Sequence, residues 1–188
     1  MDYLNQTLTF ESDQIYYTFL DSRCEVMMDW EKPLMSASAA YICENGGDIL
    51  EIGFGMGISA GYMHSHSIST HTIIENHPDV IPKAKEWANG KSNVTIISQS
   101  WADVTGSLGT YDGIFYDTSF DDKGNLFSSS LSELIKTGTK LSVFNSFSSE
   151  TNDHNIEMNY KQINVSTPNS ASQYFNNDNV YYMPMKEF

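Results

Sequence analysis

The most constraining feature of this sequence is a glycine-rich segment that follows a short apolar run. The run, residues 48–52, carries the acid Glu51 near its end and is typical of a buried strand. Gly53, Gly55 and Gly57 follow at alternating positions, where the absence of a Cβ lets the backbone turn sharply and approach a ligand. Small residues come next and can begin a helix. The segment therefore predicts a strand, a nucleotide-binding turn and a helix.

The spacing of the glycines separates two kinds of ligand. The dinucleotide fingerprint is G-x-G-x-x-G, whereas this turn has the pattern G-x-G-x-G with Glu51 two residues before it. A carboxylate at that point repels a pyrophosphate and suits a cationic or hydroxyl group, such as the α-ammonium group of S-adenosylmethionine (SAM). An ordinary glycine-rich turn without a ligand is the alternative.

Acidic residues follow other apolar runs as well. Glu75 comes directly after the run 70–74, and Asp117 comes directly after the run 111–116. Because the carboxyl ends of parallel strands meet at one edge of an α/β sheet, we expect both acids to lie near Glu51. An acid at the position of Glu75 accepts the ribose hydroxyls of a nucleoside, and a solvated acid at a strand end is the alternative.

A further run, 94–98, leads to Trp101 and Asp103. The indole ring suits stacking on adenine, and the carboxylate suits accepting a hydrogen bond from the exocyclic amine. A tryptophan in the core and an aspartate that caps a helix explain the same two residues equally well.

The order of the expected elements predicts an α/β fold. We expect a three-layer Rossmann-like sheet, mostly parallel, with an antiparallel edge hairpin formed by 161–165 and 180–184. The 188 residues fit a single domain, in which a helical N-terminal lid segment, 1–45, precedes the core, 46–188. Apolar residues at loosely helical spacing support the N-terminal helix: Phe10, Ile15, Tyr16, Phe19 and Leu20. A second helix is expected over 33–43.

Composition and charge restrict the partners. The formal net charge of -14 disfavours nucleic acid and anionic membranes, and it tolerates cationic or zwitterionic small molecules. No signal peptide and no apolar run long enough to span a bilayer is evident, and Cys24 and Cys43 give no disulfide framework. We therefore expect a cytoplasmic protein. Histidines without the regular spacing of metal ligands lead us to expect no metal: His64, His66, His71 and His77.

Five segments in this order and spacing resemble one known family: residues 26–35, 49–57, 73–76, 101–104 and 111–118. They resemble the class I SAM-dependent methyltransferases and, within that class, guanidinoacetate N-methyltransferase and its relatives. The resemblance continues weakly through 144–145 and 181–184. The glycine turn is shared by the whole superfamily, whereas the first and last segments are much more specific.

The resemblance implies a cationic acceptor held by two carboxylates, Glu31 and Asp117. Asp117 would also take the proton that the acceptor nitrogen releases. Asn145 begins the segment 145–148 that would hold a carboxylate of the acceptor. Without the resemblance, Glu31 reads as an acid at a helix N-terminus. The implied SAM site consists of Met27, Trp30, Glu51, Gly53, Gly55, Gly57, Glu75, Asn76, Trp101, Asp103 and Asp117, although core packing also explains Met27 and Trp30.

The expected function is thus SAM-dependent N-methylation of a small guanidino or amino compound. One alternative is an enzyme of the same fold that uses SAM itself as its substrate and releases methylthioadenosine. Ser119, where the family has a tyrosine, and a short segment after Asn145 motivate that alternative. A SAM-binding scaffold without turnover is another. The short segment also lacks the last helix of the fold, and a homodimer would cover the bare sheet face.

Overall fold

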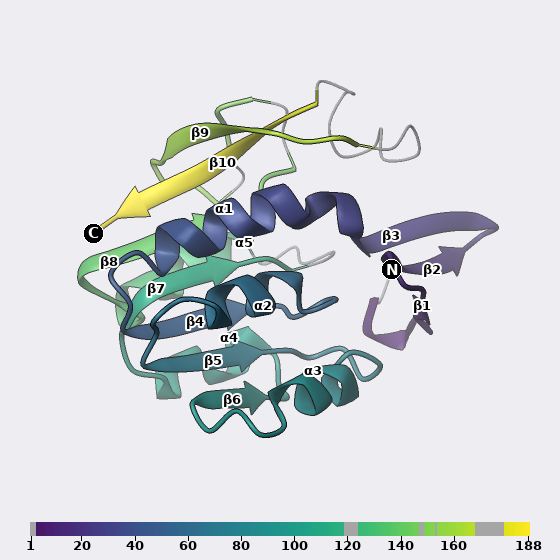
Figure 1. Cartoon of the computed structure of the whole chain (residues 1–188), viewed down its shortest axis with the longest axis horizontal. Coiled ribbons are helices and arrows are strands. Elements are labelled where there is room, and N and C mark those ends of the chain that lie inside the picture. The colour runs from purple at the N-terminus through teal and green to yellow at the C-terminus, as the bar shows by residue number, and fades with distance from the viewer. Residues whose placement is uncertain (1–2, 119–123, 147–148, 153, 168–178) are drawn as a thin grey trace.

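A seven-stranded sheet runs through the molecule. Figure 1 presents the computed structural model, which describes residues 3–118, 124–146, 149–152, 154–167 and 179–188. The strand order is β6-β5-β4-β7-β8-β10-β9. The strands are β4 (Asp48–Ile52), β5 (Thr70–Ile74), β6 (Val94–Ile97), β7 (Tyr111–Tyr116), β8 (Ile135–Val143), β9 (Asn159–Asn164) and β10 (Val180–Glu187). The first five are parallel, and β10 is antiparallel to both β8 and β9. The predicted fold and its edge hairpin are confirmed.

Helices cover both faces of this sheet (Figure 1). They are α1 (Lys32–Ile42), α2 (Ile58–His64), α3 (Ile81–Ala88), α4 (Trp101–Val104) and α5 (Gly124–Ser130), with short 3-10 turns η1 (Tyr3–Asn5), η2 (Asp29–Glu31), η3 (Thr105–Ser107) and η4 (Leu131–Glu133). Pro33 lies in the first turn of α1, which confirms the helix expected there. Within the described residues, none of these helices has the length and hydropathy needed to cross a bilayer.

The two faces of the sheet follow from the alternation of side chains along its strands. On β4, Ile49 packs in one cluster with α1 and α2, whereas Leu50 and Ile52 pack in another with α4 and α5. On β7, Phe115 joins the first cluster and Ile114 joins the second. The result is the three-layer arrangement that the sequence predicts.

The N-terminal segment is a sheet, so the helix predicted from its apolar spacing is wrong. Residues of this segment form an antiparallel sheet of β1 (Thr9–Phe10), β2 (Gln14–Phe19) and β3 (Ser22–Met28). On β2, the buried Ile15 and Tyr17 alternate with more exposed neighbours. That period of two belongs to a strand, and the adjacent aromatic residues concealed it in the sequence. Among the described residues of the expected lid segment, α1 is the α-helix, and η1 and η2 are short 3-10 turns.

The face of the sheet that carries Tyr116 of β7 is covered by other residues. In the described residues no helix lies between β8 and β9, as the sequence suggested. Nevertheless, His154 is buried edge-on against Tyr116, and Ile156 and Met158 pack against the same apolar cluster. These residues replace the cover that a helix would provide. The homodimer remains a prediction, but it is no longer needed to cover this face.

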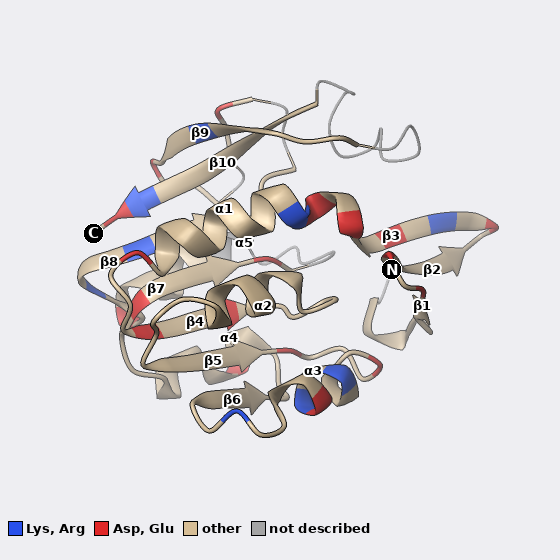
Figure 2. Ribbon diagram, viewed as in Figure 1, with Lys and Arg blue, Asp and Glu red and all other residues tan. Residues whose placement is uncertain are grey.

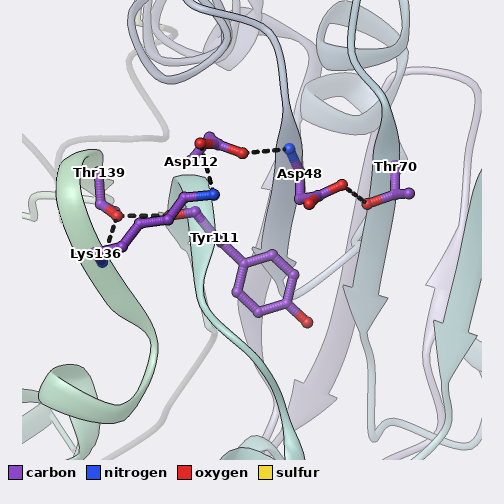
Figure 3. Close-up of polar contacts among 6 residues, drawn as sticks. All are labelled: Asp48, Thr70, Tyr111, Asp112, Lys136 and Thr139. Carbon is purple, nitrogen blue, oxygen red and sulfur yellow. Dashed lines mark hydrogen bonds and ion pairs between the residues drawn. The ribbon is translucent and has the colours of Figure 1, made fainter.

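Polar side chains fasten the amino ends of the parallel strands (Figure 3). The N–H of Asp48 donates to Asp112 Oδ2 at 2.8 Å, and Lys136 Nζ lies 2.8 Å from Asp112 Oδ1. Thr139 Oγ1 donates to the carbonyl of Tyr111 at 2.6 Å. Together these contacts join β4, β7 and β8 at one edge.

Asp112 is held in its charged form. Burial alone raises its pKa, but the hydrogen bonds from Lys136 and from the Asp48 N–H, with the charge of Lys136, outweigh burial, so that the pKa of Asp112 lies below its usual value of 3.8. Because the folded pKa is lowered, this group stabilises the fold fully above the unfolded pKa. The contribution is lost as the pH falls through the folded pKa.

Asp112→Ala should lower the free energy of unfolding by about 1–3 kcal/mol, because the Asp48 N–H loses its acceptor. Thr70→Ala is the matched control, since it removes an exposed 2.7 Å bond to the Asp48 side chain at the same edge. It should change the free energy by less than about 0.5 kcal/mol. Chemical denaturation at neutral pH measures both, and equal losses in the two variants would contradict the role given to Asp112.

Candidate active site

The opposite edge of the sheet gathers the predicted site residues. The N–H of Asp117, directly after β7, donates to the carbonyl of Ile52 at 2.9 Å, and the N–H of Gly53 donates to the carbonyl of Ile74 at 2.8 Å. Asp117, Gly53 and Glu75 therefore stand at three neighbouring strand ends. Figure 2 shows the acidic residues after β5 and β7 on the same side of the molecule as the acidic residues of η2, just before α1. The common edge expected from the sequence is present.

The glycines of the turn let other segments approach it closely. At Gly53 φ is +95°, and a Cβ would lie 1.8 Å from the carbonyl oxygen of Asp117. At Gly55 a Cβ would lie 2.5 Å from Met27 Sδ, and that sulfur accepts the N–H of Met56 at 3.1 Å. Any side chain at Gly53 would therefore displace Asp117, and any at Gly55 would displace Met27.

The Glu75 carboxylate is held in one orientation by backbone donors. Its Oε2 accepts the N–H of Phe54 in the glycine turn at 2.9 Å. Its Oε1 accepts the N–H groups of Asn76 and His77, each at 2.8 Å. A carboxylate offers about four acceptor sites, so one remains for a ligand. This geometry suits the predicted contact with ribose hydroxyls.

Glu51 differs from its sequence expectation, because its carboxylate points into the protein. The side chain is fully buried, Ser59 Oγ donates to its Oε1, and His71 Nε2 lies 2.9 Å from its Oε2. Since side chains alternate along a strand, Glu51 shares the face of Ile49, beneath α1 and α2. Both oxygens are thus engaged before any ligand binds.

Glu31 and Asp117 form a second acidic group near the start of α1. Glu31 is buried, and its Oε1 accepts the N–H of Met28 at 2.8 Å. Burial, then the charges of Asp117 and Glu25, raise the pKa of Glu31 well above its usual value. Burial, then the charges of Glu51 and Glu75, raise the pKa of Asp117 to about 7. Because burial and neighbouring negative charges raise both pKa values, a cation bound beside these acids would favour their charged forms.

Two residues near this group were missed by the sequence reasoning. Glu25 is buried on β3, and its inward position follows the same alternation as Met27, which a strand prediction would have revealed. Tyr181 is fully buried on β10, and burial, with the nearby charges of Asp117 and Glu31, raises the pKa of its hydroxyl. The sequence around Tyr181 predicts only an edge hairpin, so it did not indicate that this side chain lies near Asp117 and Glu31.

Asn145 lies beside Tyr181 and links two strands. Its N–H donates to the Tyr181 hydroxyl at 3.0 Å, and its Nδ2 donates to the carbonyl of Tyr182 at 2.9 Å. These bonds place the end of β8 against β10. Ser119 and residues 147–148 lie outside the described residues.

Other predicted cofactor residues are spread more widely. Trp101 is buried, with its ring edge-on to those of Tyr116 and Phe127 at centroid distances of 5.7 Å, so core packing accounts for it. Asp103 and Asn76 are exposed. Trp30 packs partly buried against the cluster that contains Met27, and Gly57, with φ +71°, precedes α2. Among the described residues no group of His, Cys, Asp or Glu is arranged to hold a metal ion.

Fold and site together define a class I SAM-dependent methyltransferase. The cofactor of that class is SAM, and the residues fit it: a turn without Cβ atoms lies beside a Glu75 carboxylate that retains an acceptor site. The family model described as guanidinoacetate N-methyltransferase matches residues 10–145. The chain belongs to the guanidinoacetate N-methyltransferase family.

Curated relatives carry the name protein arginine N-methyltransferase 2. The protein from Aspergillus oryzae is 36% identical over 154 residues, which cover 76% of this chain and 36% of that relative. The protein from Kluyveromyces lactis is 29% identical over 218 residues, covering 99% of this chain and 53% of the relative. The chain thus spans about a third to about half of the length of these relatives.

Solved structures with little sequence identity share the fold. The N-methyltransferase NodS from Bradyrhizobium japonicum WM9 superposes with a TM-score of 0.64 at 12% identity, covering 83% of this chain and 94% of that chain. Spermidine synthase from Thermotoga maritima also has a TM-score of 0.64 at 12% identity, covering 96% of this chain and 72% of that chain.

Gly53→Ala should weaken SAM binding, because the new Cβ must displace the carbonyl of Asp117. Backbone strain of about 1–3 kcal/mol corresponds to roughly 5- to 150-fold in affinity. Gly61→Ala is the control, since no atom lies within 4 Å of its added Cβ. That helical change should leave SAM affinity unaltered and stabilise the fold by about 0.5–1 kcal/mol. Titration calorimetry measures both, and unchanged affinity in Gly53→Ala would remove the turn from the site.

Proposed function

We propose that this chain transfers the methyl group of SAM to a guanidinium nitrogen. One observation carries the proposal: Glu31 is buried, Asp117 is half-buried, and neither forms an ion pair with a basic residue among the described residues. In the described part of the chain, the ion pairs of lysines involve Asp29, Asp112 and Glu44 instead. A planar cation with several N–H donors would supply the missing charge, and two carboxylates can orient it.

Bound SAM supplies an electrophilic methyl group on its sulfonium. The chain's own part is to place the acceptor nitrogen in line with that methyl group and to hold it there. As the N–CH3 bond forms and the C–S bond breaks, the nitrogen loses a proton. The Asp117 carboxylate is placed to receive it, because a pKa of about 7 matches the working pH of a general base.

The relatives' names bear on the size of the acceptor. A free guanidino compound fits the family model, whereas the curated relatives are named for arginine in proteins. The net charge of -14 also favours approach by a basic peptide. We therefore extend the proposed acceptor from a small guanidino or amino compound to the arginine side chain of a protein.

Product analysis tests these acceptors together. The chain is incubated with SAM and with small guanidines, amines or an arginine-rich polypeptide, and mass spectrometry follows both products. Transfer to a guanidinium yields S-adenosylhomocysteine and an acceptor heavier by one methylene. Methylthioadenosine formed without any acceptor would instead identify SAM as the substrate, and binding without either product would indicate a scaffold.

Asp117→Asn should reduce turnover by roughly 10²-fold, because the amide neither balances the cation nor accepts its proton. Its affinity for SAM should stay close to that of the parent chain. Asp48→Asn is the matched control, since Asp48 is the first residue of β4, at the end of the strand opposite the glycine turn. Turnover and calorimetric SAM affinity are measured for both variants. Undiminished turnover in Asp117→Asn would show that the acceptor assignment is wrong.

The value of kcat/KM should rise as the pH increases through about 7, where Asp117 loses its proton. The charged carboxylate binds the cation and accepts the proton, so kcat/KM is low at a pH below about 7. Glu31 titrates with Asp117 as a pair, which broadens the step. A pH–rate profile measures the step, and Asp117→Asn should flatten it. A parent profile that is level between about pH 6 and pH 8 would contradict this role.

A further inference from the structure

His71 is buried directly beside the acid that precedes the glycine turn. His71 on β5 pairs in register with Ile49, and Glu51 is two residues further along β4. Glu51 and His71 are therefore diagonal neighbours on one face of the sheet, within reach of long side chains. Both are fully buried, and Nε2 lies 2.9 Å from Oε2.

A buried carboxylate needs a partner of opposite charge. An isolated one costs several kcal/mol in a dry interior, and removal of the partner leaves that cost uncompensated. Within the described residues, no lysine or arginine forms an ion pair with Glu51, so His71 and Ser59 are its side-chain partners. Cys43 also lies near Glu51, and burial, followed by the Glu51 charge, raises the pKa of its thiol to about 12. On its other side His71 meets the edge of the Trp87 ring.

Glu51 links His71 to the glycine turn. Ser59 Oγ donates to the second oxygen of Glu51, and Ser59 stands two residues after Gly57 in the first turn of α2. At the start of the turn, Glu75 accepts the N–H of Phe54. The two acids thus hold the turn from both ends.

We propose that His71 is a positioning residue for SAM, which acts through Glu51 and Ser59 to hold the glycine turn in its binding geometry. The proposal concerns the SAM site and rests on the proposed function only through that cofactor. It assigns Glu51 an indirect role, in contrast to direct contact between its carboxylate and the ammonium group of SAM.

Titration calorimetry with SAM alone tests the proposal on the full chain. His71→Phe should raise the Kd for SAM about tenfold, within the range for coupled neighbouring residues. Ser59→Ala should raise it in the same direction while preserving the buried apolar packing. His71→Gln, which can still donate a hydrogen bond, should recover part of the affinity. His64→Phe is the matched control, because it removes an imidazole from the same Trp87 ring and leaves Glu51, Ser59 and His71 in place.

A double-mutant comparison separates the indirect role from direct contact. Glu51→Gln combined with His71→Phe should bind SAM no more weakly than the weaker single variant, because both changes break one chain of contacts. Effects that multiply would overturn the proposal, as would an unaltered Kd in His71→Phe. If His71→Phe does not fold, the SAM affinities of Ser59→Ala and His71→Gln provide the test. Unaltered affinity in both variants would overturn the proposal. Since no acceptor is present, a wrong acceptor assignment would leave these results unchanged.

Discussion

The repulsion between buried carboxylates is the constraint to which the rest of this structure responds. Glu31, Glu51 and Glu75 are all buried at or near one edge of the sheet, and each accepts hydrogen bonds from the protein. Backbone N–H groups donate to Glu31 and Glu75, whereas Ser59 Oγ donates to one oxygen of Glu51 and His71 lies beside the other. Burial nevertheless raises the pKa of Glu31 well above its usual value, so that a cationic ligand would favour its charged form. The edge therefore keeps a strong preference for a cationic ligand.

Residues at the amino ends of the strands stabilise the fold, whereas residues at the carboxyl ends form the candidate site. At the amino ends of the strands, Lys136 pairs with Asp112, and Lys140 pairs with Glu44. At the carboxyl ends, the acids near Asp117 have no lysine or arginine partner among the described residues. With 10 basic and 24 acidic residues in the chain, basic side chains are scarce. Lys136 and Lys140 are engaged at the amino ends, and in the proposed reaction the cofactor and the acceptor supply the positive charge at the site.

The N-terminal sheet does more than cover the site, because it also contacts the residues that form it. Its strand β3 ends in Met27 and Met28, and η2 follows at once with Glu31. Met27 Sδ accepts an N–H from the glycine turn, and the Met28 N–H donates to Glu31. One short stretch of chain thus contacts the glycine turn and fixes Glu31, one of the two acids proposed to hold the acceptor. This explains why the segment 26–35 was the more specific part of the family resemblance.

The sequence by itself determined the strand–turn–helix unit, the parallel order of the strands and the acids at their ends, because these depend on local patterns of two, three or four residues. Tertiary structure decided the environment of each acid. Period-two alternation put Glu51 beneath α1 and α2, where His71 from the next strand meets it, and packing absorbed Trp101 into the core. Glu25 and Tyr181 reached the site through distant strands. Burial and the proximity of other charges are properties of the assembled layers, and no local pattern encodes them.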